Sequence, residues 1–286
     1  MKRWTPYVLI APAMVVLFSI WAYPSIMNFY YSFWEMNYGQ LNSFIGLKNY
    51  LNLLADARFW NALGNTFIFV FACVVLELIL GLIVALILSK YSVRARQILG
   101  SVIFLPYMVA QSVAGIIWRL LWNYDYGLIN YIIGFLGIAP QLWLSDPVLA
   151  KVAVIVTEVW RNVPFMIMVL LAGIISMPSE PFEAAKVDGA SPFQIFKNLT
   201  IPLLAPSILT GLLFRTVFAI RIFDTVFTLT KGGPGEATTP LGLLIYQNNF
   251  GYFRNGYASA IAIVMLITGL IFSIFYLKSL GKEAEL

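Results

Sequence analysis

Seven ionisable side chains lie inside or at the ends of long apolar stretches of this sequence. They are Glu77, Arg119, Glu158, Arg161, Arg215, Arg221 and Asp224. A charge at the centre of a membrane helix costs about 2.5 to 3.5 kcal/mol, so such groups are expected to face a cavity or a partner. Glu158 and Arg161 are three residues apart and can meet on one helix face. Arg221 and Asp224 have the same spacing. For both pairs a structural ion pair and a functional role remain open, while Glu77 and Arg119 are expected to anchor helices to one another.

The chain contains few residues that could act in catalysis. There is no His and a single Cys, Cys73, which lies inside an apolar run and is expected to be a small core or lipid-facing residue. Disulfide frameworks and Cys/His zinc sites are therefore excluded. No nucleophile is placed beside a base, so a membrane enzyme using Glu77, Glu158 or Asp224 has little support. A G-x-x-x-x-G-K-[ST] phosphate loop is also missing, so any ATP hydrolysis belongs to a partner chain.

The elements that hold these residues are long apolar segments. Of 286 residues, 60% are hydrophobic and 11% charged, with a mean hydropathy of +0.84, whereas a soluble chain is about 25% charged. Six segments reach the roughly 20 residues that a helix needs to cross a bilayer, and none alternates as barrel strands do. They are placed at 6–32, 62–89, 98–122, 148–175, 201–229 and 258–277. The sequence therefore predicts an all-α polytopic membrane protein with six transmembrane helices and a single transmembrane domain over residues 1–286.

The first segment raises the question of a cleaved leader. It begins MKRWTPYVLIAPAM, which imitates a secretory signal peptide. Its apolar run continues to Phe33, well beyond the 7–15 apolar residues of a signal peptide. We therefore expect a retained first helix.

Lysine and arginine in the connections predict the orientation of the chain. One side collects nine of them, namely Lys2, Arg3, Lys90, Arg94, Arg96, Lys186, Lys197, Lys278 and Lys282. The other side collects four, namely Lys48, Arg58, Lys231 and Arg254. Both termini are therefore expected in the cytoplasm. The net charge of +5 reflects these topology signals, and it does not indicate nucleic acid, whose recognition needs a clustered basic patch on a soluble fold.

Two connections on the outer side carry structure of their own. Gly46–Asn61 mixes Leu and aromatic residues with polar ones, which predicts a short helix lying at the membrane interface. Lys231–Gly256 contains the turn signal GGPG and several aromatic residues.

A polar segment at residues 179–200, between the fourth and fifth apolar runs, contrasts with its surroundings. Ser179 is suited to begin a helix that runs to about Val187, and Gly189 is suited to end it through a positive φ. Ser191 and Gln194 have the spacing of a capping box around Pro192, which predicts a second helix ending near Asn198. The residues alone leave two interpretations open: an ordinary interfacial loop, or a rigid aromatic-tipped projection that docks into another protein.

The same segment resembles the EAA loop of ABC-importer permeases. Its sequence EAAKVDGASPFQIFKNLTIPLLAP follows the pattern E-A-A-x-x-D-G-A, then F, then I/L-P-x-x-x-P. The likeness extends to FIGLKNY, FWNALGNT, WRNVPF, FDTVFTLTKGGPG and NGYASA, and so to nearly the whole chain. It implies a type I ABC importer permease fold, similar to the maltose transporter, with this segment as the cytoplasmic coupling helix. The residues implied to contact the ATPase are Glu183, Ala184, Ala185, Asp188, Gly189, Ala190, Phe193 and Phe196.

The resemblance also implies a substrate site midway across the membrane, on the helices before and after the coupling loop. Carried onto this sequence, its residues are Glu158, Arg161, Asn162, Phe165, Arg215, Phe218, Ala219 and Ile222. Phe165 and Phe218 would stack on a sugar, and the polar groups would bind its hydroxyls. The charged side chains depart from the mostly neutral site expected for a plain disaccharide. Two arginines could favour an anionic sugar such as a phosphate, uronate or sulfonate, so neutral and anionic substrates both stay open.

The implied assembly is a binding-protein-dependent importer of a sugar or sugar derivative in the cytoplasmic membrane of a bacterium or archaeon. The chain would pair with a second, homologous permease, although self-pairing stays open. It would dock on two ATPase subunits that use ATP and Mg, and accept substrate from an extracytoplasmic solute-binding protein. The chain itself is expected to bind no cofactor and no metal. The alternative is an ion-coupled secondary transporter of a small polar solute, against which stand six spans and no inverted repeat.

Overall fold

The computed structural model describes residues 5–283 of the chain. These residues group into two compact units. The first unit comprises the residues up to Trp60 together with Leu244–Ile267, and the second comprises Asn61–Leu243 together with the residues from Thr268 on. Lys2 and Arg3, on which the predicted orientation partly depends, lie outside the described residues, as does the side chain of Lys282.

Long apolar helices dominate the structure. Within residues 5–283, five of them can cross a membrane by length and composition, and a sixth span is a bent pair of helices. The five are Leu9–Tyr31, Ala57–Ser89, Pro147–Ile175, Pro192–Ile220 and Asn255–Gly281. The first consists of α1 (Thr5–Leu17), a π-helical turn at Phe18–Ala22 and α2 (Tyr23–Tyr31). The predicted helical, polytopic fold is confirmed.

The third predicted segment, 98–122, is not one straight helix. Helix α5 (Val93–Met108) and helix α6 (Gln111–Leu121) meet at an angle of 91°. Val109 and Ala110 between them have extended backbones, with ψ of 131° and 142°. The prediction of a continuous span was wrong here, because hydropathy reports the length of an apolar run but not whether the helix bends within it.

The fifth predicted segment, 201–229, is also divided. Helix α11 (Ile201–Ile220) ends in a tight turn, in which Arg221 N–H donates to the carbonyl of Phe218 and Ile222 N–H to that of Ala219. A separate helix, α12 (Asp224–Leu229), then packs against α6. A Cβ added at Gly115 of α6 would collide with the Thr228 side chain of α12, so only glycine allows this close approach. The apolar run continues past Ile220 because Ile222, Val226 and Leu229 enter the protein core.

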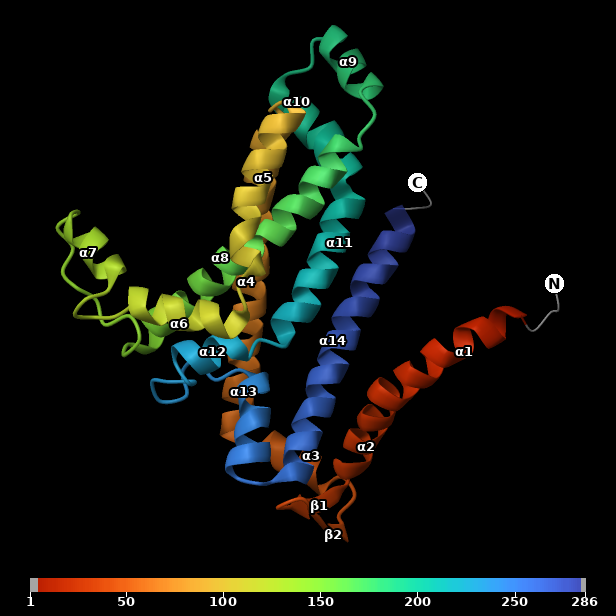
Figure 1. Cartoon of the computed structure of the whole chain (residues 1–286), viewed down its shortest axis with the longest axis vertical. Helices are drawn as coiled ribbons and strands as arrows, with labels where there is room; N and C mark the ends of the chain where they lie inside the picture. The colour runs from red at the N-terminus through yellow and green to blue at the C-terminus, as the bar shows by residue number, and fades with distance from the viewer. Residues whose placement is uncertain (1–4, 284–286) are drawn as a thin grey trace. The chain divides into compact units, whose positions relative to one another are not determined.

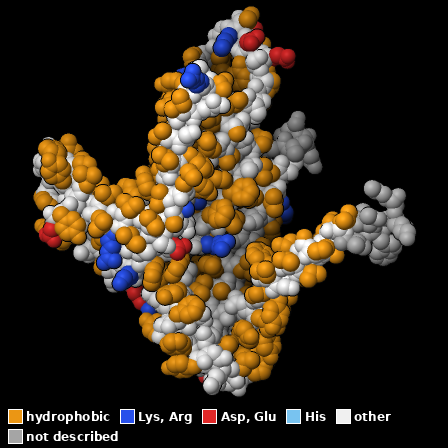
Figure 2. Space-filling model, viewed as in Figure 1, with side chains coloured by type: hydrophobic (Ala, Val, Ile, Leu, Met, Phe, Trp, Pro, Cys, Tyr) orange, Lys and Arg blue, Asp and Glu red, His pale blue; other side chains and the backbone are white. Residues whose placement is uncertain are grey.

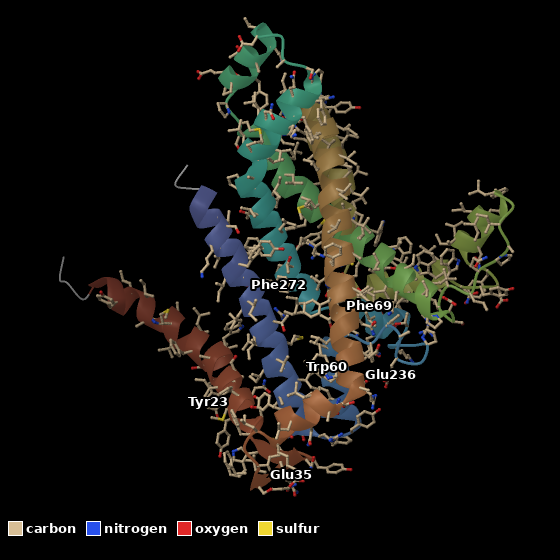
Figure 3. The ribbon with its side chains drawn as sticks, turned by 180° about the vertical axis from the view of Figure 1, so that it is seen from behind. Tyr23, Glu35, Trp60, Phe69, Glu236 and Phe272 are labelled. Atoms are coloured by element: carbon tan, nitrogen blue, oxygen red, sulfur yellow. The ribbon has the colours of Figure 1, made fainter. Side chains whose placement is uncertain are left out.

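The second unit is built around α4 (Ala57–Ser89), α8 (Pro147–Ile175) and α11 (Figure 1). Figure 3 labels Phe69 on α4. Near one end of α8, this buried ring belongs to a cluster with Trp122, Val154, Val226 and Leu229. Nearer the other end, Met166, Leu170 and Leu204 form a second cluster between α8 and α11. Short helix α7 (Leu128–Gly134) follows α6. These two cores fix the helices that carry the predicted site.

The first unit contains elements that the sequence did not all reveal. Helix α3 (Lys48–Ala55) confirms the predicted short helix between residues 46 and 61. A hairpin of β1 (Trp34–Asn37) and β2 (Gln40–Phe44) precedes it and was not predicted. Its two-residue turn, Tyr38-Gly39, has positive φ at both residues, as such hairpin turns require. The ring of Tyr38 stacks on Phe253, which follows α13 (Leu241–Tyr246) and a π-helical turn at Gln247–Gly251 and precedes α14 (Asn255–Glu283).

Candidate substrate site and coupling segment

A hydrogen-bonded polar network lies in the middle of α8. Buried Asn162 donates through Nδ2 to the backbone carbonyl of Glu158 at 2.8 Å and to Glu158 Oε2 at 2.9 Å. Arg161 Nη1 donates to Asn162 Oδ1 at 2.9 Å. The amide of Asn162 therefore links the Glu158 carboxylate to the Arg161 guanidinium, whereas the sequence suggested that these two groups pair directly. The network combines hydrogen-bond donors and acceptors at a membrane depth where such groups are costly.

The break between α5 and α6 completes this network. Arg161 Nε donates to the Val109 carbonyl at 2.9 Å, and its guanidinium carbon lies 5.6 Å from the centre of the Tyr107 ring. Non-helical backbone at membrane depth is tolerated where protein or a cavity satisfies it, and Arg161 does so here. Oε1 of Glu158 is buried and has no hydrogen-bond partner within residues 5–283. One acceptor of the network is therefore unsatisfied.

Aromatic rings border the network on one side. Phe165 stacks on Tyr107 with ring centres 5.9 Å apart and meets Phe214 edge-on at 6.3 Å. Tyr107 and Phe214 were missed by the sequence reasoning, because neither stands out in an apolar run and both come from other helices. Phe218 on α11 is 51% exposed. Both predicted stacking residues thus keep some ring surface accessible.

The remaining predicted substrate residues are buried in the second unit. Ala219 and Ile222 are buried, and Ile222 belongs to the core beside α12. Arg215 forms a bidentate ion pair with Glu77 of α4, in which Nε and Nη2 lie 2.5 and 2.8 Å from the two carboxylate oxygens. The two side chains are 4% and 0% exposed. Glu77 anchors two helices, as expected, but its partner is 138 positions away and was not foreseen.

The other two expectations for charged residues turn out differently. Asp224 accepts a hydrogen bond from Ser112 at 3.3 Å, and no ion pair joins it to Arg221 in the part of the chain that the structure describes. Arg119 is exposed and borders a surface cavity, so it is not placed as a helix anchor.

The predicted coupling segment has most of the local geometry expected for it. Helix α9 (Glu180–Val187) is followed by Gly189 at φ +74°, and Ser191 with Gln194 forms a complete capping box at the start of α10 (Pro192–Ile195). Ser179 occupies the N-cap position of α9 but makes no side-chain capping bond. The second helix does not end near Asn198, since a π-helical turn at Phe196–Thr200 leads directly into α11. These glycine and cap positions were predictable because their signals are local.

The surface of this segment differs from that of the helices below it. In Figure 1, α9 lies beyond the ends of α8 and α11, and Figure 2 shows charged side chains gathered at that end above largely hydrophobic helices. Phe193 is 70% exposed, and Glu183, Ala184, Asp188 and Gly189 are also exposed. Ala185, Ala190 and Phe196 are half-buried. The segment therefore presents an aromatic and acidic surface without a cover of its own.

Known proteins resemble the chain over most of its length. It is 39% identical over 273 residues to the trehalose/maltose transport system permease protein MalF of Thermococcus litoralis, covering 95% of this chain and 92% of the relative. It is 34% identical over 291 residues to the sulfoquinovosyl glycerol transport system permease protein SmoG of Agrobacterium fabrum, covering 97% and 94%. The crystal structure of a bacterial ABC transporter that imports the acidic polysaccharide alginate shares the fold, with a TM-score of 0.85 and 20% identity over 98% of this chain and 96% of that one.

The match to a sequence family agrees with these relatives. Residues 77–278, more than half of the chain, match the family described as "Binding-protein-dependent transport system inner membrane component". The matched range holds both the α8 network and the coupling segment. Its members are permeases, and separate ATPase subunits hydrolyse ATP. The chain therefore belongs to this family, as a multi-pass membrane permease subunit of an ABC importer.

Proposed function

We propose that this permease carries a sugar or sugar derivative through a site formed by the α8 network and the rings beside it. The observation that carries the proposal is the network itself, in which Glu158, Asn162 and Arg161 are hydrogen-bonded in the middle of a membrane-spanning helix. Discontinuous helices and polar groups at membrane depth are features of solute pathways. The two relatives named above are permeases for trehalose/maltose and for sulfoquinovosyl glycerol, which favours a sugar as the solute.

Each side chain near the network has a role suited to a hydroxylated ring. Glu158 Oε1 accepts from a sugar hydroxyl, and the unused N–H groups of Arg161 donate to hydroxyl oxygens. Phe165 and Phe218 stack on the apolar face of the ring. Asn162 holds the acid and the base in position. Arg215, Ala219 and Ile222 support the site from within the core rather than by direct contact.

The charge of the site favours a neutral sugar. An anionic substrate was suggested by two arginines, yet Arg215 is already compensated by Glu77. Arg161 is balanced by Glu158 through Asn162. The site therefore has no uncompensated positive charge to attract an anion.

We extend the proposal to the assembly and the transport cycle, which the family membership supports. The coupling segment, with Glu183, Asp188 and Phe193 at its surface, docks on one of two ATPase subunits, which use ATP and Mg. The chain pairs with a second homologous permease, receives sugar from a solute-binding protein outside, and keeps both termini in the cytoplasm. ATP-driven closure of the ATPases moves the coupling segments together, and the cavity changes from inward-facing to outward-facing.

The decisive experiment measures ATPase activity and uptake of the complete importer in liposomes. Binding proteins are loaded with neutral disaccharides, sugar acids or sulfonated sugars. We expect a neutral sugar to stimulate both activities. Arg161→Gln removes a charged donor worth about 1.5 to 3 kcal/mol and should lower uptake about 10- to 100-fold. Lys151→Gln removes a charge from the same helix outside the network and serves as the matched control.

Two outcomes would contradict the proposal. If no loaded binding protein stimulates the ATPase, the substrate is not a sugar. If Arg161→Gln and Lys151→Gln transport equally well, the α8 network is structural.

A further inference from the structure

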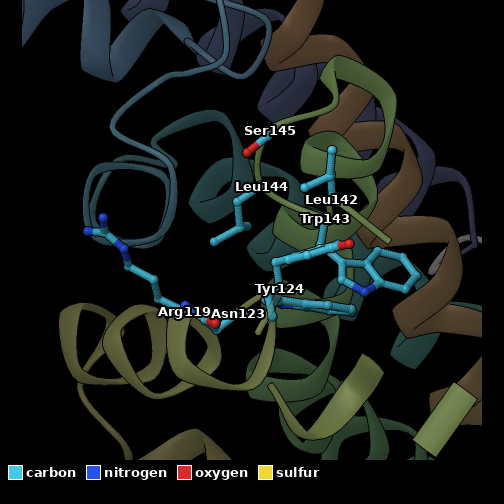
Figure 4. Close-up of a pocket in the computed structure, with 8 residues that line it drawn as sticks. Arg119, Asn123, Tyr124, Leu142, Trp143, Leu144 and Ser145 are labelled. Carbon is cyan, nitrogen blue, oxygen red and sulfur yellow. The ribbon is translucent and has the colours of Figure 1, made fainter. Parts of the chain in front are cut away.

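A second pocket lies at the end of α8 that is away from the coupling segment. It has a volume of about 210 Å³ and is enclosed by the C-terminal end of α6 and the chain just before α8 (Figure 4). Arg119 comes from α6 on one side, and Leu144 and Ser145 come from the other. The pocket lies where α8 begins at Pro147, and Arg161 of the network is 14 residues further along, or about 21 Å of helix at 1.5 Å per residue. The pocket is thus distinct from the α8 network.

Two indoles form a fixed part of its wall. Trp122 is buried and Trp143 half-buried, with ring centres 4.9 Å apart. Trp143 Nε1 donates to Asn130 Oδ1 at 2.8 Å and Trp122 Nε1 to Thr157 Oγ1 at 3.3 Å. Because both indole N–H groups are engaged by protein and Trp122 is buried, the wall offers a ligand chiefly the apolar face of Trp143. Such surfaces suit the C–H face of a sugar ring.

The opening of the pocket is polar and accessible. Arg119, Tyr124 and Ser145 are exposed, and Tyr124 retains 48% of its surface. Across residues 5–283, no hydrogen bond or ion pair engages the Arg119 guanidinium. Its five N–H groups, with the two hydroxyls of Tyr124 and Ser145, are therefore available to ring hydroxyls.

The volume limits what the pocket can hold. Drug-sized ligands occupy pockets of about 300 to 1,000 Å³, and a water molecule takes about 30 Å³ of liquid volume. A cavity of about 210 Å³ is therefore suited to a group the size of one sugar ring.

The pocket is rigidly connected to the depth of the α8 network. Trp118 lies 5.4 Å from Trp122 and 5.6 Å from Trp160, measured between ring centres. Trp160 immediately precedes Arg161. A row of four indoles, Trp143, Trp122, Trp118 and Trp160, thus runs from the wall of the pocket to the network. The row holds the two pocket indoles in place, so the stacking surface is formed before any ligand arrives.

We propose that this pocket is a second sugar site, which binds a single pyranose ring with its apolar face on the Trp143 indole and its hydroxyls toward the donors Arg119, Tyr124 and Ser145, while buried Trp122 supports Trp143 from behind. The inference rests on the proposed function, since it assumes that sugars reach this protein. In the proposed orientation the pocket is at the outer end of α8, where substrate arrives from the binding protein. The site would hold one ring of the substrate before it enters the membrane.

Thiol protection tests the site directly. Leu142→Cys places a thiol in the pocket lining at a position that is 53% exposed, while native Cys73 is 2% exposed and should not react. In the complete reconstituted importer, D-glucose should slow labelling of this thiol by a maleimide at least about threefold. Sorbitol, an acyclic polyol, should not. Asp125→Cys is the matched control, because Asp125 is exposed in the turn that also holds Tyr124 but does not line the pocket.

Second variants separate this inference from the proposed function. Tyr124→Ala or Arg119→Ala, combined with Leu142→Cys, should abolish protection by glucose, whereas Arg161→Gln should lower uptake about 10- to 100-fold and leave the protection intact. If glucose and sorbitol affect labelling equally while the unmodified importer still transports sugar, the pocket is no sugar site and the proposed function stands. If the importer transports no sugar at all, the proposed function is wrong, and the inference that rests on it is wrong as well.

Discussion

The buried ion pair between Glu77 and Arg215 makes a quantitative prediction. Glu77→Leu removes the carboxylate and leaves the Arg215 guanidinium uncompensated among side chains that exclude water. Breaking a buried pair in this way costs about 3 to 5 kcal/mol, whereas replacing both partners by apolar residues is often neutral or stabilising. We therefore expect Glu77→Leu to be strongly destabilising and the double variant Glu77→Leu with Arg215→Met to recover most of the loss.

The chain contains a natural reporter for this measurement. Cys73 is the single cysteine, is 2% exposed and lies one helical turn before Glu77 on α4. A thiol-reactive fluorophore should label it only when that part of the protein opens. A change of 1 kcal/mol moves the midpoint of thermal unfolding by about 2 to 4 °C in proteins of 150 to 250 residues. Labelling of Glu77→Leu on heating should therefore begin about 6 to 20 °C below that of the unmodified protein.

The double-mutant cycle decides whether the reasoning holds. The interaction energy is the difference between the double variant and the sum of the two single variants. If the effects of Glu77→Leu and Arg215→Met simply add, the two charges do not stabilise each other. A midpoint for Glu77→Leu within 2 °C of the unmodified protein would refute the assignment of a buried, essential pair.

Two further predictions concern glycines. Gly189→Val forces a β-branched residue to φ +74°, which should distort the α9–α10 turn and uncouple ATP hydrolysis from uptake. Gly189→Asn should keep the two activities coupled, because asparagine tolerates this backbone conformation. Equal coupling in both variants would contradict the role of the turn. Gly115→Ala should lower the midpoint of thermal unfolding, because the added Cβ collides with Thr228. Adding Thr228→Ala should restore part of the loss. A midpoint unchanged by Gly115→Ala would show that α6 and α12 separate easily.

What the sequence predicted well was local. The positive φ of Gly189 and the capping box of Ser191 with Gln194 depend on neighbouring residues only, and both are present in the structure. The apolar segments were recognisable because a membrane helix must satisfy its backbone within itself over about 20 residues. Helix α9 ends at Val187, as predicted.

What the sequence could not predict depends on distant partners or on direction. Arg215 was assigned to the substrate because its ion-pair partner, Glu77, lies on another helix far away in the chain. Asn162 joins Glu158 to Arg161, and the two charged groups do not pair directly. The sequence does not show this because the side-chain rotamers are set only in the folded protein. The pocket indoles Trp122 and Trp143 went unnoticed for the same reason, because in an apolar sequence a tryptophan gives no sign of what it faces.

The right-angled break after α5 has a consequence for biosynthesis. At 1.5 Å per residue, α5 is about 24 Å long and α6 about 17 Å, and neither alone spans a hydrocarbon core of about 30 Å. Helix α6 is covered by α12, which the ribosome makes roughly 110 residues later, or about 5 to 20 s at ordinary rates of elongation. During that interval the newly inserted α6 has no permanent neighbour on this face. The packing of α6 is therefore completed only after α12 has been synthesised.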